Sequence, residues 1–352
     1  MTLAQAMERI APADQDARRE ARRRQNDMAK PLGSLGLLED AIDTLAGAQG
    51  SARVEIGRRA VVVFCADNGV VAQGVTQCGQ EVTAVVTENL NRGDTTVCIM
   101  SRHAGVDVLP VDIGVARPVT GDKILQLNVM RGTRDMTVES AMTREECIRA
   151  IETGIDIVRE CKECGYQLLA TGEMGIGNTT TSSAVASVLL GVAPDTVTGR
   201  GAGLSSEGLT RKIRAIERAI ALHHPCVDDV IGVVSSVGGL DIAGMIGLYL
   251  GGALYHIPVV MDGFISAVSA LAAVRLCPNV RGYLMASHVS AEPAGQRILD
   301  ALDAKPLICA GMRLGEGTGA IAAIALLDLS LAVYHEMVSF DDIHIDHYEH
   351  LT

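Results

Sequence analysis

The sequence lacks tryptophan and has few other aromatic residues, with three Phe and six Tyr among 352 residues. Proteins that bind single-stranded nucleic acid stack bases on aromatic side chains, so this composition argues against that class. Basic residues are too few to offset the acidic ones, and the net charge of −12 argues against a partner with a phosphate backbone. Any anionic ligand must therefore be held by backbone amides and a few cationic side chains.

The sequence also lacks a cysteine framework. Among its nine cysteines, Cys161 and Cys164 form a single CxxC pair late in a charged helical pattern, and no second pair follows. Zinc sites and disulfide frameworks need more partners than this, so free thiols in a reducing compartment fit better. His344, His347 and His350 have only loose metal-like spacing, which a solvated C-terminal tail explains more simply. We expect no metal and no cofactor.

Long hydrophobic runs are missing as well. The longest, residues 242–255, is rich in glycine and too short to span a bilayer, so it indicates a core helix. The first residues are charged and contain no apolar segment of the signal-peptide type. We expect a soluble, cytoplasmic protein with neither a membrane nor a nucleic acid as partner.

Glycine and small apolar residues are abundant, with 37 Gly and 48% hydrophobic residues. From residue 59 a unit repeats in which a short β-branched run leads to a polar turn and then to a helical stretch. A capping box at Thr143 opens a helix that should end near Cys164. The predicted strands are residues 60–65, 106–111, 167–170, 230–235, 257–261, 283–286 and 307–312.

Strands that alternate with helices predict an α/β fold with a mostly parallel sheet and helices on both faces, which is Rossmann-like. Residues 51–317 form the predicted large α/β domain that carries the active site. The helical residues 1–50, broken by a turn at 30–36, are predicted to join residues 318–352 in a small helical subdomain. The last helix should run from Thr318 to about Met337.

Two glutamates stand alone on glycine-rich turns. Glu316 lies between Gly315 and Gly317, ahead of an apolar run, and Glu173 lies in a similar turn at 172–180. A charge in such a place is costly to desolvate unless it has a task or a partner. Glycines allow close approach of a ligand, and the helix that follows offers free amides. The pattern predicts a general base beside a phosphorylated ligand, the alternative being that each glutamate only caps a helix.

The remaining polar turns are expected at the same edge of the sheet, because ligands of open α/β sheets bind beyond the carboxyl ends of the strands. Lys212 follows a glycine-rich loop at 199–203 and is a candidate cation for a phosphate, with a solvated helix face as the alternative. His288 is more simply interpreted as a hydrogen-bonded structural residue than as an acid or base.

Seven short motifs occur in a fixed order, at residues 67–70, 172–180, 199–203, 238–241, 262–264, 287–292 and 313–319. Taken together, the chain from Lys30 to about residue 337 resembles the nicotinate-nucleotide–dimethylbenzimidazole phosphoribosyltransferase family. Each motif alone is weak, whereas the ordered set is specific.

The resemblance implies transfer of ribose 5-phosphate from nicotinate mononucleotide to a lower-ligand base. Nicotinate leaves, the anomeric configuration inverts, and the product is the α-ribazole 5′-phosphate of cobamides. By this resemblance Glu316 is the base that takes the acceptor proton, and Glu173 acts in the same pocket. The implied phosphate ligands are Gly175, Gly201, Lys212 and Ser290. Further implied substrate contacts are Ile176, Asn178, Thr179, Asp241, Asp262, Leu314 and Gly315.

The implied base pocket consists of Cys78, Val86 and Met174. Cys78 and Val86 stand where well-studied relatives have a serine and a glutamine, so the pocket should be more apolar and less selective. Other benzimidazoles, a purine or a phenol such as p-cresol remain possible acceptors, the last as in related enzymes built from paired paralogous subunits.

The resemblance also implies a homodimer, with a heterodimer as the alternative. A non-catalytic partner subunit would have no need of Glu316, which favours catalysis. A nucleotide-binding oxidoreductase is disfavoured because no GxGxxG motif follows the first strand.

Overall fold

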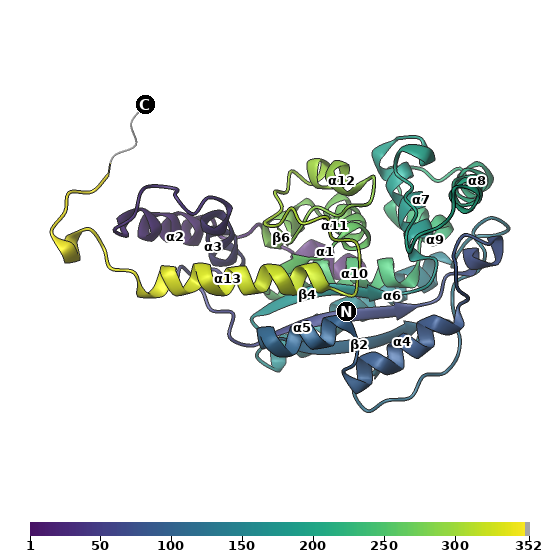
Figure 1. Cartoon of the computed structure of the whole chain (residues 1–352), viewed down its shortest axis with the longest axis horizontal. Coiled ribbons are helices and arrows are strands. Elements are labelled where there is room, and N and C mark those ends of the chain that lie inside the picture. The colour runs from purple at the N-terminus through teal and green to yellow at the C-terminus, as the bar shows by residue number, and fades with distance from the viewer. Residues whose placement is uncertain (349–352) are drawn as a thin grey trace.

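The computed structural model describes residues 1–348. Its centre is a six-stranded sheet in the order β3-β2-β1-β4-β5-β6, and every neighbouring pair is parallel (Figure 1). The strands are β1 (Arg59–Ala66), β2 (Asp107–Gly114), β3 (Leu125–Gln126), β4 (Leu168–Met174), β5 (Val259–Met261) and β6 (Leu284–Ala286). The predicted parallel α/β architecture is confirmed.

Helices cover both faces of this sheet. They are α1 (Leu3–Arg9), α2 (Gln15–Asp27), α3 (Leu37–Gln49), α4 (Glu81–Arg92), α5 (Thr96–Ala104), α6 (Arg144–Glu163), α7 (Asn178–Leu190), α8 (Ser206–His223), α9 (Val230–Val237), α10 (Leu240–Tyr255), α11 (Phe264–Leu276), α12 (Gly295–Ala301) and α13 (Thr318–Glu336). As predicted, the capping box at Thr143 starts α6.

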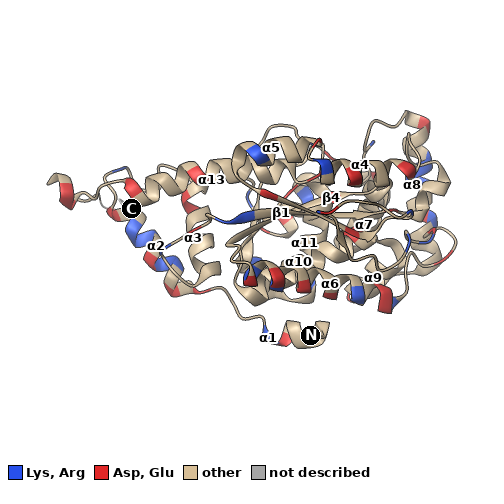
Figure 2. Cartoon of the chain, turned by 90° about the horizontal axis from the view of Figure 1, so that it is seen from below, with Lys and Arg blue, Asp and Glu red and all other residues tan. Residues whose placement is uncertain are grey.

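Strand β1 explains how two hydrophobic cores form. Successive side chains of a strand point to opposite faces, so Val62 and Phe64 join the core under α6, α10 and α11, whereas Val61 and Val63 join the core under α4, α5 and α13. Burial on both faces is why this strand is a continuous apolar run rather than an alternating one. Figure 2 shows the charged residues on outer helices such as α2 and α6, while α10 and α11 carry few.

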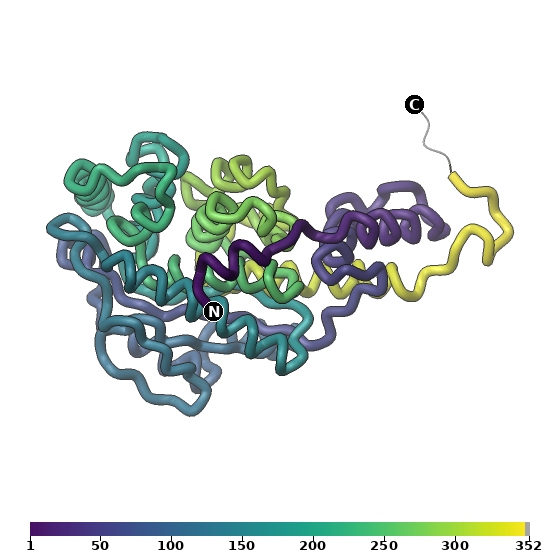
Figure 3. Tube along the Cα trace, turned by 180° about the vertical axis from the view of Figure 1, so that it is seen from behind, coloured from purple at the N-terminus to yellow at the C-terminus, as the bar shows by residue number. Residues whose placement is uncertain are grey.

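Helices α2 and α3 extend beyond the sheet, and α13 connects them to it (Figure 1). The first residues of α13 pack on β4 and β5, and its later residues reach α3, where Ser330 Oγ donates to the Leu38 carbonyl oxygen at 3.1 Å. A buried ion pair, Lys30 Nζ to Glu39 Oε1 at 2.8 Å, fixes the turn that precedes α3. Viewed from behind, α1 lies on α6 and α10 before the chain reaches α2 (Figure 3). The division into two domains stays a prediction.

Within residues 1–348, α13 is also the one helix whose length and apolar composition would allow it to cross a membrane. More than half of its apolar stretch is buried against α5, α3 and the sheet, as in the core helix of a globular domain.

Two predicted strands are wrong. Residues 230–235 belong to α9, because Asp229 caps a helix there and accepts a hydrogen bond from the Gly232 amide at 3.1 Å. A short β-branched run does not by itself distinguish a buried strand from a buried helix. Residues 307–312 form only a single bridge, between His288 and Ile308, since Gly311 turns the chain with a φ of +65°. The two-residue strand β3 has no counterpart among the predicted strands.

Helices α6 and α10 pack through glycines. A Cβ atom on Gly247 would lie 1.9 Å from the Ile151 carbonyl oxygen, and one on Gly154 would lie 2.2 Å from the Gly244 carbonyl oxygen. At these two positions the backbones of α6 and α10 therefore approach too closely for any side chain to fit between them.

Gly247→Ala is expected to lower the free energy of unfolding by about 1–3 kcal/mol through overpacking. In an open helix the same change would raise stability, because alanine has the higher helix propensity. Urea unfolding would measure the change, and Gly57→Ala, whose Cβ would meet its nearest neighbour at 3.5 Å, is the control. A stabilised Gly247→Ala protein would show that the two helices can separate without cost.

Candidate active site

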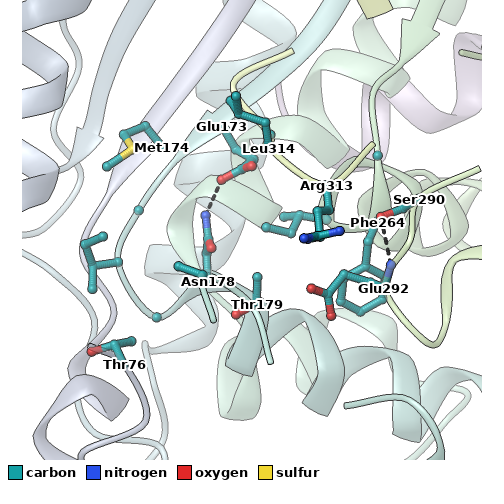
Figure 4. Close-up of a pocket in the computed structure, with 18 of the residues that line it drawn as sticks. Thr76, Glu173, Met174, Asn178, Thr179, Phe264, Ser290, Glu292, Arg313 and Leu314 are labelled. Carbon is teal, nitrogen blue, oxygen red and sulfur yellow. Dashed lines mark hydrogen bonds between the residues drawn. The ribbon is translucent and has the colours of Figure 1, made fainter. Parts of the chain in front are cut away.

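A cavity lies beyond the carboxyl ends of β4, β5 and β6 (Figure 4). It is lined by the turn after each of these strands, by the glycine-rich loop before α8 and by the loop before α4. All the predicted site residues except Asp241 and Val86 line it. The polar turns thus meet at one edge of the sheet, as the parallel order requires.

Glu173 is buried at the end of β4 and faces the first turn of α7. The Asn178 side-chain amide donates to Glu173 Oε2, as the dashed line in Figure 4 shows. Burial raises the pKa of Glu173 well above its ordinary value, and the nearby carboxylates of Asp241, Asp262 and Glu316 raise it further. Both causes favour the protonated form of Glu173.

Asp241 lies behind this pair rather than in the cavity wall. It is fully buried in the first turn of α10, where Oδ1 accepts from the Ile242 amide at 2.9 Å and Oδ2 has no partner within residues 1–348. Burial raises the pKa of Asp241 to about 6, although the hydrogen bond from the Ile242 amide opposes the rise. The predicted contact with substrate does not fit this position.

Glu316 occupies the left-handed region, with a φ of +62°, between two glycines that do the same. Such a backbone is costly for a non-glycine residue and is common at functional sites. Its carboxylate is half-buried, and Oε2 accepts from the Val97 amide in the first turn of α5 at 3.3 Å. Burial raises the pKa of Glu316, the Val97 amide lowers it, and Asp262 raises it.

Asp262 caps the helix that follows Glu316. Its oxygens accept from the amides of Gly317 at 3.3 Å, Gly319 at 2.8 Å and Ala320 at 3.1 Å. Neither Glu316 nor Glu173 caps the helix that follows it. The N-cap residues of α13 and α7 are glycines, which have no side chain to cap with. The capping alternative is wrong for those two helices, and the glutamates stay available to a ligand.

Lys212 is fully buried, so the interpretation as a solvated helix face is wrong. Its Nζ donates to Thr179 Oγ1 at 2.7 Å and to the Gly199 carbonyl oxygen at 3.1 Å. Burial lowers its pKa to about 8, and the neighbouring Glu292 raises it. Gly201 lies beside it with a φ of +52°. This end of the cavity combines a cation, hydroxyls and backbone close to the start of α7.

Part of the cavity lining is apolar and includes Cys78, Met174 and Ile176. Next to Cys78, Gln77 Nε2 donates to the Gly203 carbonyl oxygen of the glycine-rich loop. Val86 is half-buried on α4 outside the cavity. That helix turns Thr83 inward instead, and the Thr83 hydroxyl accepts from the Ile176 amide at 3.0 Å.

Several lining residues were not predicted. Phe264, Glu292 and Arg313 belong to the motifs quoted above, so the signal was present without a role attached. Glu292 points into the cavity, and its Oε2 is buried without a hydrogen-bond partner in the described chain (Figure 4). His288 lines the cavity too and lies 2.9 Å from Ser287 Oγ through its Nδ1, the kind of contact expected of a structural histidine. Within residues 1–348 no group of three or more His, Cys, Asp or Glu side chains is arranged to hold a metal ion.

Comparison with known proteins shows the family to which the chain belongs. A family model described as phosphoribosyltransferase matches residues 10–345. The nicotinate-nucleotide–dimethylbenzimidazole phosphoribosyltransferase of Ruminiclostridium cellulolyticum is 45% identical over 351 residues, which is 100% of both chains. That of Acetivibrio thermocellus is 47% identical over 327 residues, 93% of each. The chain belongs to this phosphoribosyltransferase family.

A solved structure supports the assignment of the family fold. The crystal structure of CobT from Thermus thermophilus has a TM-score of 0.90 and 38% identity, and the match covers 95% of this chain and 100% of that one. As a member of the phosphoribosyltransferase family, the protein is a pentosyltransferase.

The raised pKa of Glu173 has a measurable consequence. Because its folded-state pKa lies above the ordinary value of 4.5, the native protein keeps a proton that the unfolded chain loses, so stability falls as pH rises. The stabilisation is fully present below pH 4.5 and is lost as the pH rises toward the folded-state pKa. Glu173→Gln keeps the hydrogen bond from Asn178 without a titrating group. Its stability relative to wild type is expected to rise between pH 5 and pH 8, by at most about 1.4 kcal/mol per pH unit.

Urea unfolding at both pH values measures this difference, with Glu336→Gln on the exposed end of α13 as the control. An equal offset at pH 5 and pH 8 would mean that Glu173 is ionised in the native protein.

Proposed function

We propose that the protein transfers ribose 5-phosphate from nicotinate mononucleotide to 5,6-dimethylbenzimidazole or a similar base. The products are α-ribazole 5′-phosphate, with inversion at the anomeric carbon, and nicotinate, in a step of cobamide nucleotide-loop assembly. The observation that carries the proposal is that one cavity holds both the half-buried Glu316 carboxylate, on its glycine turn, and the buried Lys212 cation. The relatives' names support the substrates.

The phosphate is assigned to the Lys212 end. Lys212 supplies a positive charge, Gly201 and Gly175 supply backbone without side chains in the way, and Ser290 supplies a hydroxyl. A Cβ on Gly175 would lie 2.2 Å from the Ala66 carbonyl oxygen, so only glycine fits there. Amides at the start of α7 and a cation suit a phosphate in an otherwise acidic protein.

The chemistry needs one base. The bond between the anomeric carbon and the pyridinium nitrogen breaks, and its electron pair returns to the departing nicotinate. The unprotonated ring nitrogen of the acceptor bonds to that carbon from the opposite face, and the proton on its other nitrogen passes to Glu316. Since the pyridinium is already a cationic leaving group, neither a general acid nor a metal is required to expel it.

Glu173 is assigned a place beside the ribose and the incoming base. Its raised pKa favours the protonated form, which can donate a hydrogen bond to a hydroxyl while it accepts one from Asn178. We also propose that the protein is a cytoplasmic homodimer, as the family resemblance implies. No relative reported above is named for a phenol acceptor or for a non-catalytic role.

Glu316→Gln is expected to lower kcat for dimethylbenzimidazole about 10²–10⁴-fold, because the amide cannot take the acceptor proton. The fold should be retained, since the side chain is half-buried and makes one hydrogen bond through an oxygen that glutamine keeps. Steady-state kinetics with nicotinate mononucleotide and isotherms for nucleotide binding test this, with Glu336→Gln as the control. A variant that retains the wild-type rate would reject Glu316 as the base.

Cys78→Ser is expected to raise the ratio of kcat/KM for dimethylbenzimidazole to kcat/KM for p-cresol several-fold. The reason is that a hydroxyl among the apolar lining residues can form a hydrogen bond with a ring nitrogen. Val86→Gln, whose side chain lies outside the cavity, should leave the ratio unchanged. Competition between the two acceptors in one reaction gives the ratio directly. A larger effect from Val86→Gln than from Cys78→Ser would show that the acceptor contacts α4.

A further inference from the structure

The cavity is rich in carboxylates. Glu173, Asp262, Glu292 and Glu316 all line it, and each disfavours a second negative charge nearby. The proposed substrate nevertheless brings two anionic groups, a phosphate on the ribose and a carboxylate on the pyridine ring. Each needs a cation inside the cavity.

The cationic side chains that line the cavity are Arg200, Lys212 and Arg313. Lys212 is buried against Thr179 and Gly199 at the phosphate end. The Arg200 guanidinium donates to the Leu204 carbonyl oxygen at 2.7 Å and to Ser206 Oγ at 3.1 Å, so it holds its own loop together. Arg200 is therefore engaged within its own loop, and Lys212 is already assigned to the phosphate.

Arg313 differs from them, because its guanidinium has no hydrogen bond and no ion pair with any side chain or backbone group of residues 1–348. The side chain is exposed to solvent at the mouth and points into the cavity (Figure 4). A free guanidinium has five donors in a planar fork, which matches the two oxygens of a carboxylate.

The backbone around Arg313 is fixed on both sides. The Met312 carbonyl oxygen accepts from the Ala291 amide at 3.0 Å, and beyond Glu316 the Gly317 amide donates to Asp262. Arg313 therefore precedes the proposed base in a loop whose two ends are hydrogen-bonded to segments that follow β5 and β6.

We infer that Arg313 binds the carboxylate of the nicotinate group, so that it selects nicotinate mononucleotide over nicotinamide mononucleotide. This rests on the proposed function. The two nucleotides share the ribose phosphate and differ in one carboxylate or carboxamide, and a charge-assisted bidentate pair with arginine is available only to the carboxylate.

The same contact aids departure of the leaving group. While bound to ribose, the nicotinate group carries a pyridinium charge and a carboxylate charge that cancel. When the glycosidic bond breaks, the ring nitrogen becomes neutral and the group gains one net negative charge. A guanidinium at the carboxylate therefore stabilises the departing nicotinate more than the bound substrate, which is the condition for lowering the barrier.

The test compares both nucleotides in the wild-type protein and in Arg313→Gln, with dimethylbenzimidazole as acceptor. We expect kcat/KM for nicotinate mononucleotide to fall about 10- to 100-fold, the size of a lost charge-assisted hydrogen bond. The value for nicotinamide mononucleotide should change less than about threefold, and the inhibition constant of free nicotinate should rise in parallel. Arg313→Lys, which keeps the charge but loses the fork, should lie between the two proteins.

Arg297→Gln, an exposed arginine on α12 outside the cavity, is the matched control and should change neither value. An equal fall for both nucleotides in Arg313→Gln would assign Arg313 to the shared ribose phosphate and overturn the inference. Unchanged values for both would overturn it as well. A wild-type protein that turns over neither nucleotide would instead reject the proposed function, and the inference with it.

Discussion

Asp262 stands at the end of β5, and its carboxylate accepts three backbone amides from the first residues of α13 and the turn before it. One side chain thus joins the sheet edge to the helix that carries the Glu316 loop, and it satisfies amides that would otherwise be left without partners. A charged acceptor also suits the positive end of that helix. With the helix start secured by Asp262, the strained backbone at Glu316 can hold its own carboxylate toward the ligand.

Several carboxyl groups lie close together in and beside the cavity. Burial raises the pKa values of Glu173, Asp241 and Glu316, and the nearby carboxylates of Asp241, Asp262 and Glu316 raise that of Glu173 further. Each ionised carboxylate in such a cluster makes ionisation of its neighbours less favourable. The more exposed Glu316 then becomes the group that can exchange a proton with a ligand, and the buried pair acts through hydrogen bonds.

Local sequence carried most of the fold and of the site, because the features involved are local. The continuous apolar run at β1, the capping box at α6 and the glycine turns around Glu173 and Glu316 each act within about ten residues. The errors arose where packing between segments distant in sequence decides the secondary structure or the position of a side chain. Residues 230–235 have strand-like composition but lie in a helix capped by Asp229. Asp241 is fully buried in the first turn of α10 and does not line the cavity. Val86 lies outside the cavity because α4 turns Thr83, rather than Val86, toward Ile176. Alignment with relatives does not show which side of the helix a residue occupies.

The position of β1 in the sheet has a consequence during synthesis. This strand lies between β2 and β4, yet β4 follows it by about a hundred residues. At ribosomal rates of about 5–20 residues per second, its Val61–Phe64 segment stays without its second neighbour for several seconds. Such a β-branched run is prone to pair with other nascent chains. Arg58 and Arg59 precede it and Asp67 follows it, so charges at both ends repel identical strands until the sheet closes.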